Sequence, residues 1–303
     1  MESTVGIYGK IRAERDFVRV NAGAFQRARL DGWFQDGLGH LHTEGTRLPE
    51  EPVCFVLGAP VSPPIAGVFV PGEDAVGRRF PLIIFTTLNG AALRRGLRAV
   101  PVVLSSFFEA ASHLAQAARD LSTADLGAQV AALDQSLHQP SAGLDFETLL
   151  SLSSSFELRA VLGGLGEGAA YAMQTLVSAC AQTRARPPHS PGHVLTLDCP
   201  APTDGLRVLW IDLVQRRLAD VAVPSFFWTP QSGRLLVTLG AAPSLVLAYL
   251  ADRGHRGSRL WPLWTTSTTA HQSAVQSLTP TQRQALDSTQ ASLANILAAF
   301  ATD

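Results

Sequence analysis

Histidine, cysteine and acidic side chains could bind a metal ion, and one group of them surrounds a proline-rich stretch. Its members are His189, His193, Asp198 and Cys199. Structural zinc sites usually supply their ligands as two pairs with short, regular spacing. These four residues do not have that spacing, and the chain contains no CxxC pair. The sequence therefore predicts no metal site.

Glycine-rich segments could hold the phosphates of a nucleotide, and residues 163–168 contain four glycines. In a dinucleotide-binding fold the glycines of a GxGxxG motif follow directly after a strand. Here they follow a helical pattern and have a different spacing. A P-loop is excluded in its usual form, because Lys10 is the only lysine and Ile11 comes after it. We predict that the protein uses no cofactor.

Nucleophilic catalysis has no local signature in this sequence either. No GxSxG motif is present, and the three cysteines lie in no catalytic pattern. The sequence thus favours a non-enzymatic protein that works by binding other proteins. Catalytic residues can also come together from distant segments. One alternative therefore stays open, a hydrolase or transferase with a dispersed active site between the two halves.

Length and composition indicate where such a protein would work. The 303 residues suffice for two modest domains, and the 46% hydrophobic content supports a core that needs no disulfide. A net charge of −1 argues against binding to nucleic acid. The first residues lack a signal-peptide pattern, and no apolar run approaches the roughly 18 residues that cross a bilayer. We expect a cytoplasmic protein that does not insert into membranes.

The elements that position the functional side chains are predicted from hydrophobic periodicity. In the first part of the chain the pattern predicts a helix over 25–41, strands over 53–57, 65–70 and 80–87, and helices over 105–121 and 124–137. The strands follow one another closely, which favours antiparallel pairing. We place a linker at 138–143, between an amino-terminal domain, residues 1–140, and a carboxy-terminal region, residues 141–303.

The carboxy-terminal region contains a similar mixture of helices and strands. We predict helices over 156–182, 244–252 and 280–300, strands over 208–214, 223–228 and 235–239, and a loop over 186–192. The last helix has a clear start, since Thr279 can cap it and Pro280 suits its first turn. The fold class is therefore α/β with α+β layering, in which each half combines a small sheet with helices.

Two stretches of the amino-terminal domain combine glycine, charged and aromatic residues in a way that core packing alone does not explain. The first contains Gly6, Tyr8, Gly9, Lys10, Asp16 and Phe17, with Trp33 on the first helix. The second contains Pro71, Asp74, Gly77, Arg78, Phe80 and Pro81. We treat these residues as candidates for binding a partner protein.

Physical chemistry also offers a structural explanation for the same residues. Gly77 allows a turn between two strands, and Asp74 and Arg78 are spaced to pair across it. We favour a pair that ties the turn together over one that contacts a partner. Tyr8 and Phe17, like Trp33, are more often core residues than interface residues. If one of them is exposed next to an arginine, it would suit a protein-binding hot spot.

The two stretches resemble the amino-terminal domain of the TagF family, whose motifs read GxxGKxxxxxDF and GVxxPSxDxxGRxFPL. With looser matches downstream, the resemblance covers about residues 5–250. It implies a longin-like domain, in which helices flank an antiparallel sheet, followed here by a second helix-rich α/β region. It also implies post-translational repression of the bacterial type VI secretion system, through binding to that system's forkhead-associated scaffold protein.

Overall fold

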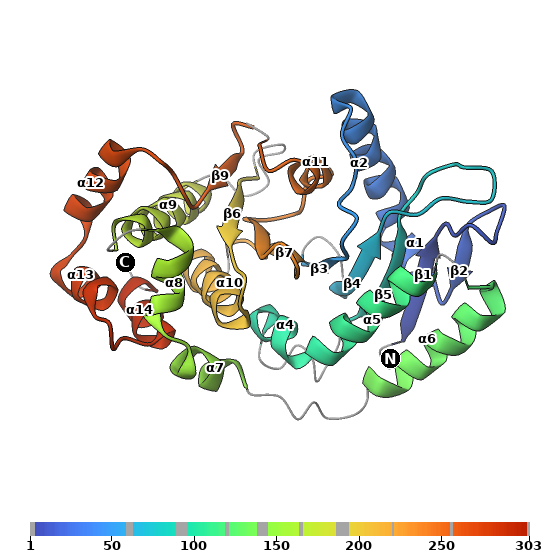
Figure 1. Ribbon diagram of the computed structural model, residues 1–303, viewed down its shortest axis with the longest axis horizontal. Coiled ribbons are helices and arrows are strands. Elements are labelled where there is room, and N and C mark those ends of the chain that lie inside the picture. Colours follow the sequence, from blue (N-terminus) through green and yellow to red (C-terminus); the bar gives the residue numbers. More distant parts are fainter. Residues whose placement is uncertain are drawn as a thin grey trace.

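Nine strands form one sheet in the computed structural model, which describes residues 4–58, 63–88, 96–118, 121–137, 145–163, 166–185, 194–219, 221–254 and 257–301. Their order across the sheet is β2-β1-β5-β4-β3-β7-β8-β6-β9 (Figure 1). The strands are β1 (Val5–Gly9), β2 (Val18–Val20), β3 (Val53–Leu57), β4 (Ile65–Val70), β5 (Leu82–Thr87), β6 (Thr196–Pro200), β7 (Ser225–Thr229), β8 (Arg234–Thr238) and β9 (Leu260–Pro262). With helices on both faces, the predicted mixed α/β fold is confirmed.

The strands predicted in the first part of the chain are confirmed. β3 and β4 have the predicted bounds, whereas β5 begins two residues later than predicted, at Leu82. Their pairing is antiparallel, as expected from the short connections. Every residue of β1, β3 and β4 is buried. These strands therefore form the centre of the fold and do not alternate between buried and exposed residues.

One sheet runs through both halves of the chain, so the prediction of a separate small sheet in each half is wrong. β3 pairs antiparallel with β7, which places Cys54 opposite Trp228. The short apolar run of β3 is typical of a strand covered on both faces, but such a run does not specify its neighbour. The division into residues 1–140 and 141–303 remains a prediction, and the predicted linker lies outside the described residues.

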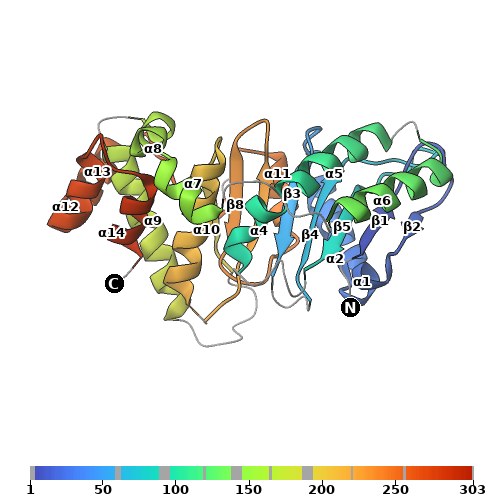
Figure 2. The same cartoon turned by 90° about the horizontal axis from the view of Figure 1, so that it is seen from below.

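Helices cover both faces of the sheet (Figure 2). One face packs against α1 (Gly23–Arg27), α2 (Leu30–Glu44) and α11 (Val246–Ala251). The other face packs against α4 (Val100–Val103), α5 (Ser105–Ala117), α6 (Thr123–Leu137) and α10 (Asp204–Leu218), with the short 3₁₀ helix η1 (Leu97–Ala99) beside them. Each face has its own hydrophobic core. The ends of the strands between these two helical layers are therefore the places where a site can open.

Three predicted helices are each divided into two. The helix over 25–41 is α1 and α2, because Arg29 between them has a left-handed φ of 53°. The helix over 156–182 is α8 (Ser155–Leu162) and α9 (Glu167–Arg184), and Gly163 after α8 has a φ of 73°. The helix over 280–300 is α13 (Pro280–Asp287) and α14 (Leu293–Phe300), where Ser292 starts the second part with a capping box.

The predicted strand over 208–214 is wrong, because these residues form the middle of α10. The helix is buried on nearly all sides, with α9, α14 and α7 (Phe146–Leu152) packed against it. A helix in that position needs no polar face, so its short apolar run has the same appearance as a buried strand. The start of the helix is conventional, since the Thr203 hydroxyl accepts a hydrogen bond from Leu206 N–H.

The remaining predictions for the carboxy-terminal region are confirmed in outline, as β7, β8 and α11. The predicted loop over 186–192 lies outside the described residues. The elements that were not predicted are β2, β6, β9, η1, α4, α7 and α12 (Thr268–Ser277). In the part of the chain that the structure describes, no helix is both long and apolar enough to cross a membrane.

Candidate functional site

A buried carboxylate organises the turn between β4 and β5. Asp74 Oδ2 accepts hydrogen bonds from Lys10 Nζ at 2.9 Å and from Arg78 Nε at 2.7 Å. Asp74 Oδ1 accepts from the backbone N–H groups of Val76 at 3.1 Å and Arg78 at 2.9 Å. Asp74 is 2% exposed and Lys10 is 7% exposed. The two sequence stretches therefore meet in one ion-pair network, which joins the end of β1 to the turn.

The backbone of the turn is held by further hydrogen bonds. Asp74 N–H donates to the Arg78 carbonyl at 3.1 Å, and Gly77 N–H donates to the Asp74 carbonyl at 2.9 Å. Ala75 N–H donates to the Glu14 carbonyl at 2.7 Å, which ties the tip of the turn to the segment between β1 and β2. Asp74 and Arg78 thus have the structural role that the sequence favoured, and a role in contacting a partner remains a prediction.

The charge of Asp74 is stabilised by its donors. Burial alone raises the pKa of a carboxyl group. The hydrogen bond from Lys10, the bonds from the backbone and side chain of Arg78 and the bond from Val76 N–H act in the opposite direction and outweigh burial. The pKa of Asp74 consequently lies well below its ordinary value. The carboxylate stays ionised in the folded protein down to strongly acidic pH.

Glycines allow the backbone of the two stretches to approach closely. Gly9 has a φ of +148°, and a Cβ atom there would lie 2.2 Å from the carbonyl oxygen of Pro81. A Cβ atom on Gly6 would lie 2.5 Å from the ring of Phe85 and 2.9 Å from the carbonyl oxygen of Asn21. These two positions require glycine because neighbouring backbone and ring atoms leave no space for a side chain.

The aromatic residues of the two stretches form one cluster on the face that α1 and α2 cover. The Tyr8 ring lies 5.1 Å from that of Phe17 and 5.8 Å from that of Phe80, and the last two are 4.9 Å apart. Lys10 Nζ lies 5.1 Å from the centre of the Phe17 ring, an additional cation–π contact. Tyr8 and Phe80 are buried, whereas Phe17 is half-buried. Burial raises the pKa of Tyr8.

Trp33 and Asp16 are not part of the ion-pair network around Asp74. Trp33 is half-buried in α2, and its Nε1 donates to the Ala242 carbonyl at 2.8 Å. Its ring stacks on Phe227 of β7 at 6.0 Å, so Trp33 packs the amino-terminal helix against the carboxy-terminal strands. Asp16 is exposed, and its carboxylate accepts from Phe17 N–H at 2.7 Å.

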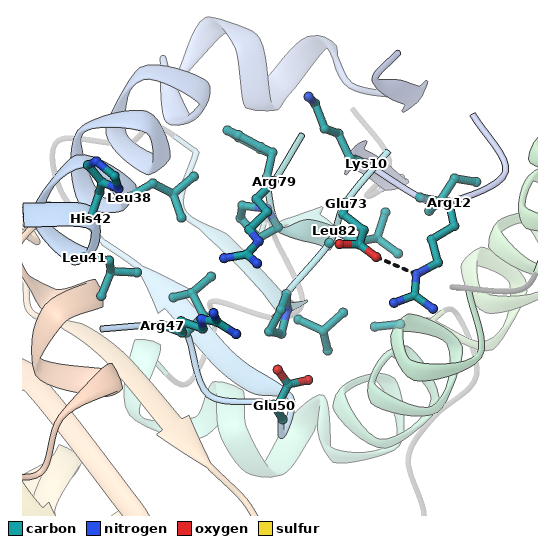
Figure 3. A pocket seen from close by; sticks show the side chains of 18 of the residues that line it. Lys10, Arg12, Leu38, Leu41, His42, Arg47, Glu50, Glu73, Arg79 and Leu82 are labelled. Carbon is teal, nitrogen blue, oxygen red and sulfur yellow. Dashed lines mark hydrogen bonds and ion pairs between the residues drawn. The ribbon is translucent and has the colours of Figure 1, made fainter. Parts of the chain in front are cut away.

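A pocket of about 440 Å³ opens at the end of the sheet, where β1 and β4 end and β5 begins. Its apolar lining comes from both layers of helices and from the strands, and includes Leu38, Leu41, Leu48, Val70, Leu82 and Ala115. The residues singled out from the sequence that line it are Lys10, Pro71, Phe80 and Pro81. Its charged lining is completed by Arg12, Arg47, Glu50, Glu73 and Arg79 (Figure 3).

Sequence reasoning did not single out these charged residues. Arg12 Nε donates to Glu73 Oε1 at 2.7 Å, beside the Lys10–Asp74 pair. Arg12 lies two positions after Lys10, and Glu73 lies directly before Asp74. Opposite charges beside the two motifs were therefore a signal that could have found this ion pair. Arg47 had no comparable signal, because it follows the end of α2 and reaches the pocket only through the tertiary fold.

Another pocket, of about 370 Å³, lies between α5 and β7, where an active site between the two halves would be expected. Its lining includes Cys54, Ser112 and His113. Burial raises the pKa of Cys54 to about 12, so its thiol is protonated at neutral pH. The Ser112 hydroxyl donates to the Phe108 carbonyl at 2.6 Å. Neither group is arranged as an activated nucleophile.

The residues considered above as metal ligands divide between described and undescribed parts of the chain. His189 and His193 lie outside the described residues. Asp198 belongs to β6, and both of its carboxylate oxygens accept hydrogen bonds from Arg234 of β8, each at 2.9 Å. The pair is buried, with 6% of each side chain exposed. Asp198 thus has a structural partner.

The low pKa of Asp74 predicts a specific dependence of stability on pH. Asp74→Asn should destabilise the protein at pH 7, since Lys10 would lose its buried counter-charge. Below about pH 4 an aspartate in the unfolded chain becomes protonated, while folded Asp74 stays ionised until its lower pKa is reached. The stabilisation present above pH 4 is therefore lost progressively as the pH falls. The difference between the melting temperatures of wild type and variant, measured by circular dichroism, should therefore narrow as the pH is lowered from 5 to 2.

The matched control for this experiment is Asp36→Asn, which changes an exposed carboxylate on α2. We expect that variant to follow wild type at every pH. A constant difference between wild type and Asp74→Asn across the acidic range would contradict the linkage of Asp74 ionisation to folding.

The Gly77 turn gives a second prediction. Gly77 has a φ of +84°, and no atom lies within 4 Å of a Cβ built there. Gly77→Ala should therefore lower the free energy of unfolding by about 1 kcal/mol through backbone strain alone. Gly77→Asn is the control, because asparagine adopts this conformation more readily and should cost less. Urea denaturation measures both, and equal losses for the two variants would rule out strain as the cause.

Comparisons with known proteins place this site within a family. No curated protein matches the chain significantly. A crystal structure of PA0076 from Pseudomonas aeruginosa PAO1 is similar with a TM-score of 0.44 and 20% identity, over 86% of this chain and 99% of that chain. The family model of the TagF N-terminal domain, described as type VI secretion system-associated, matches residues 6–139. That range contains both sequence stretches and the pocket between them, and residues 6–139 are therefore a TagF amino-terminal domain.

Proposed function

We propose that this protein is a cytoplasmic, post-translational negative regulator of type VI secretion, which acts by binding a forkhead-associated scaffold protein. The observation that carries the proposal is the match of residues 6–139 to a domain described as type VI secretion system-associated. Regulation and the choice of scaffold come from the resemblance to the TagF family.

We further propose that repression requires binding and no catalysis. Two observations support this. Three polar residues of the family motifs bind one another, since Lys10 and Arg78 both donate to Asp74. In the pocket between the two halves, Cys54 has a pKa that keeps its thiol protonated. A protein of this kind would repress by occupying its partner, so the amount of protein sets the degree of repression.

Burial limits which motif residues a partner could touch. Tyr8, Lys10 and Asp74 are covered in the folded protein. The Arg78 side chain is 61% exposed although it binds Asp74, and Asp16 is exposed on the same part of the domain. Arg78→Ala is therefore the informative variant. If it melts like wild type and binds the scaffold more weakly, the turn contacts the partner; if it loses stability and binds normally, the turn is structural.

The proposed function is tested by titration and by graded expression. Purified protein is titrated with the scaffold in a calorimeter, and secretion is measured in cells that express increasing amounts of the protein. We expect stoichiometric binding, loss of secretion with excess protein, and increased secretion on deletion. Repression at strongly substoichiometric amounts would contradict the binding mechanism and favour a catalytic one.

Phosphate dependence is measured in the same titration. Forkhead-associated domains recognise phosphorylated motifs through clustered arginines, and no phosphorylation site is evident in this chain. We therefore expect binding to persist after both proteins are treated with phosphatase. Loss of binding after treatment of this protein alone would show that the scaffold reads a phosphorylated residue of this chain.

A further inference from the structure

The lining of the pocket at the end of the sheet carries more positive than negative charge, because four basic side chains stand against the two acidic ones of Glu50 and Glu73. Four cationic side chains line it: Lys10, Arg12, Arg47 and Arg79. Lys10 is bound to Asp74, and Arg12 is bound to Glu73. Within the described part of the chain, the side chains of Arg47 and Arg79 form no hydrogen bond or ion pair.

The positions of Arg47 and Arg79 concentrate this excess of positive charge at one place in the pocket. Arg47 follows α2 and Arg79 precedes β5, yet Figure 3 shows both guanidinium groups directed into the same hollow, with the Glu50 carboxylate directed into it as well. Two like charges that face one space repel each other, and a single carboxylate such as that of Glu50 balances only one of them. The molecule as a whole has a net charge of −1, so this local excess of positive charge is a property of the pocket.

The pocket surface also restricts the chemistry of an anion that would bind. Arg47 and Arg79 are exposed at the rim, where water and salt weaken the attraction for a free ion. Below them the lining is apolar, with Leu38, Leu41 and Pro81 among its residues. A ligand that gains from both features carries carboxylates next to an apolar side chain. A guanidinium group binds a carboxylate through two parallel hydrogen bonds, which suits two arginines and two carboxylates.

We propose that this pocket is a docking site for an acidic segment of a partner protein, in which two neighbouring carboxylates bind Arg47 and Arg79 and an adjacent aliphatic side chain enters the apolar interior. The choice of a protein as the ligand rests on the proposed function. The position and the charge of the site do not depend on it. The volume of about 440 Å³ accommodates a few side chains and excludes a folded element.

The test uses a fluorescein-labelled hexapeptide of alternating leucine and paired glutamates, with the same peptide in which glutamine replaces every glutamate. Fluorescence anisotropy should show binding of the acidic peptide, weakened at least tenfold by Arg47→Gln or Arg79→Gln. The glutamine peptide should not bind. Affinity should also fall as the salt concentration rises, since exposed charges are screened.

The matched control is Arg15→Gln, which removes an exposed arginine that lies near the same turn and does not line the pocket. It should leave the affinity for the peptide unchanged. Equal weakening by Arg15→Gln and by the two pocket variants would overturn the proposal, because it would indicate attraction to a general positive field. Binding of the glutamine peptide would overturn it as well. Binding of a phosphopeptide and not the acidic peptide would show a phosphate site instead.

The same variants separate this inference from the proposed function. If variants Arg47→Gln and Arg79→Gln still bind the scaffold and the protein does not bind the acidic peptide, the docking site is rejected. The proposed regulatory function would then be unaffected. Peptide binding that depends on both arginines, in a protein that does not bind the scaffold, would support the pocket and reject the scaffold as its partner. Melting curves of each variant confirm that the fold is intact before either result is interpreted.

Discussion

Arg234→Met is expected to lower the free energy of unfolding by about 3–5 kcal/mol, because it leaves a carboxylate buried without its counter-charge. Arg234 donates two parallel hydrogen bonds of 2.9 Å to Asp198 and a third to the Tyr249 carbonyl. Lysine would be a poor substitute, since one ammonium group cannot reproduce that fork. Urea denaturation followed by circular dichroism at pH 7 measures the loss.

Two further variants distinguish charge burial from loss of a long side chain. Arg253→Met removes an exposed arginine that donates to the Ser232 carbonyl, and it should change stability by less than about 0.5 kcal/mol. Combining Arg234→Met with Asp198→Leu removes both charges and should recover most of the lost stability. If the double variant is less stable than Arg234→Met alone, the unpaired carboxylate is not the cause.

Gly9→Ala should be comparably damaging, with a loss of about 2–5 kcal/mol. The new Cβ atom would lie 2.2 Å from the Pro81 carbonyl oxygen and 2.6 Å from Leu82 Cα, both of which are backbone atoms. Backbone cannot rotate away as a side chain can, so β1 must separate from the start of β5. The positive φ of Gly9 adds strain to that overpacking. The Lys10–Asp74 pair, one residue further along, would be displaced with the strand.

The control for Gly9→Ala is the same substitution at Gly39. Gly39 is exposed in the middle of α2, and no atom lies within 4 Å of a Cβ built there. Alanine is favoured over glycine within a helix, so Gly39→Ala should raise stability by about 0.5–1 kcal/mol. Thermal melts of the two variants should therefore shift in opposite directions. A Gly9→Ala protein that melts within 1 °C of wild type would contradict the close approach of β1 and β5.

The sequence predicted those elements whose pattern depends on local chemistry. The first and last residues of β3 and β4 were predicted correctly, because turn-forming residues flank each of these short apolar runs. α10 was misassigned because a helix buried on all sides has no polar stripe. The pairing of β3 with β7 was also missed, since hydrophobicity predicts that a strand is central and does not name its neighbour.

The candidate site shows the same limit. The Asp74–Arg78 pair was predicted because the two residues lie four apart in one turn. The contact of Lys10 with Asp74 was not predicted, although both were singled out, because it depends on how β1 and the turn are placed in space. Arg47 and Arg79 come from different elements and meet only in the folded protein. A single sequence contains no pattern that predicts that these two side chains line the same pocket.

The pairing of β3 with β7 has a consequence for how the protein is made. A ribosome adds about 5–20 residues per second, so β3 is synthesised roughly ten to thirty seconds before β7. During that interval Val53–Leu57 has β4 on one side and an unpaired edge on the other. An apolar strand edge of this kind pairs readily with other nascent chains. We expect the yield of soluble protein to fall when synthesis is paused between these strands, and to recover when a chaperone that covers apolar edges is supplied.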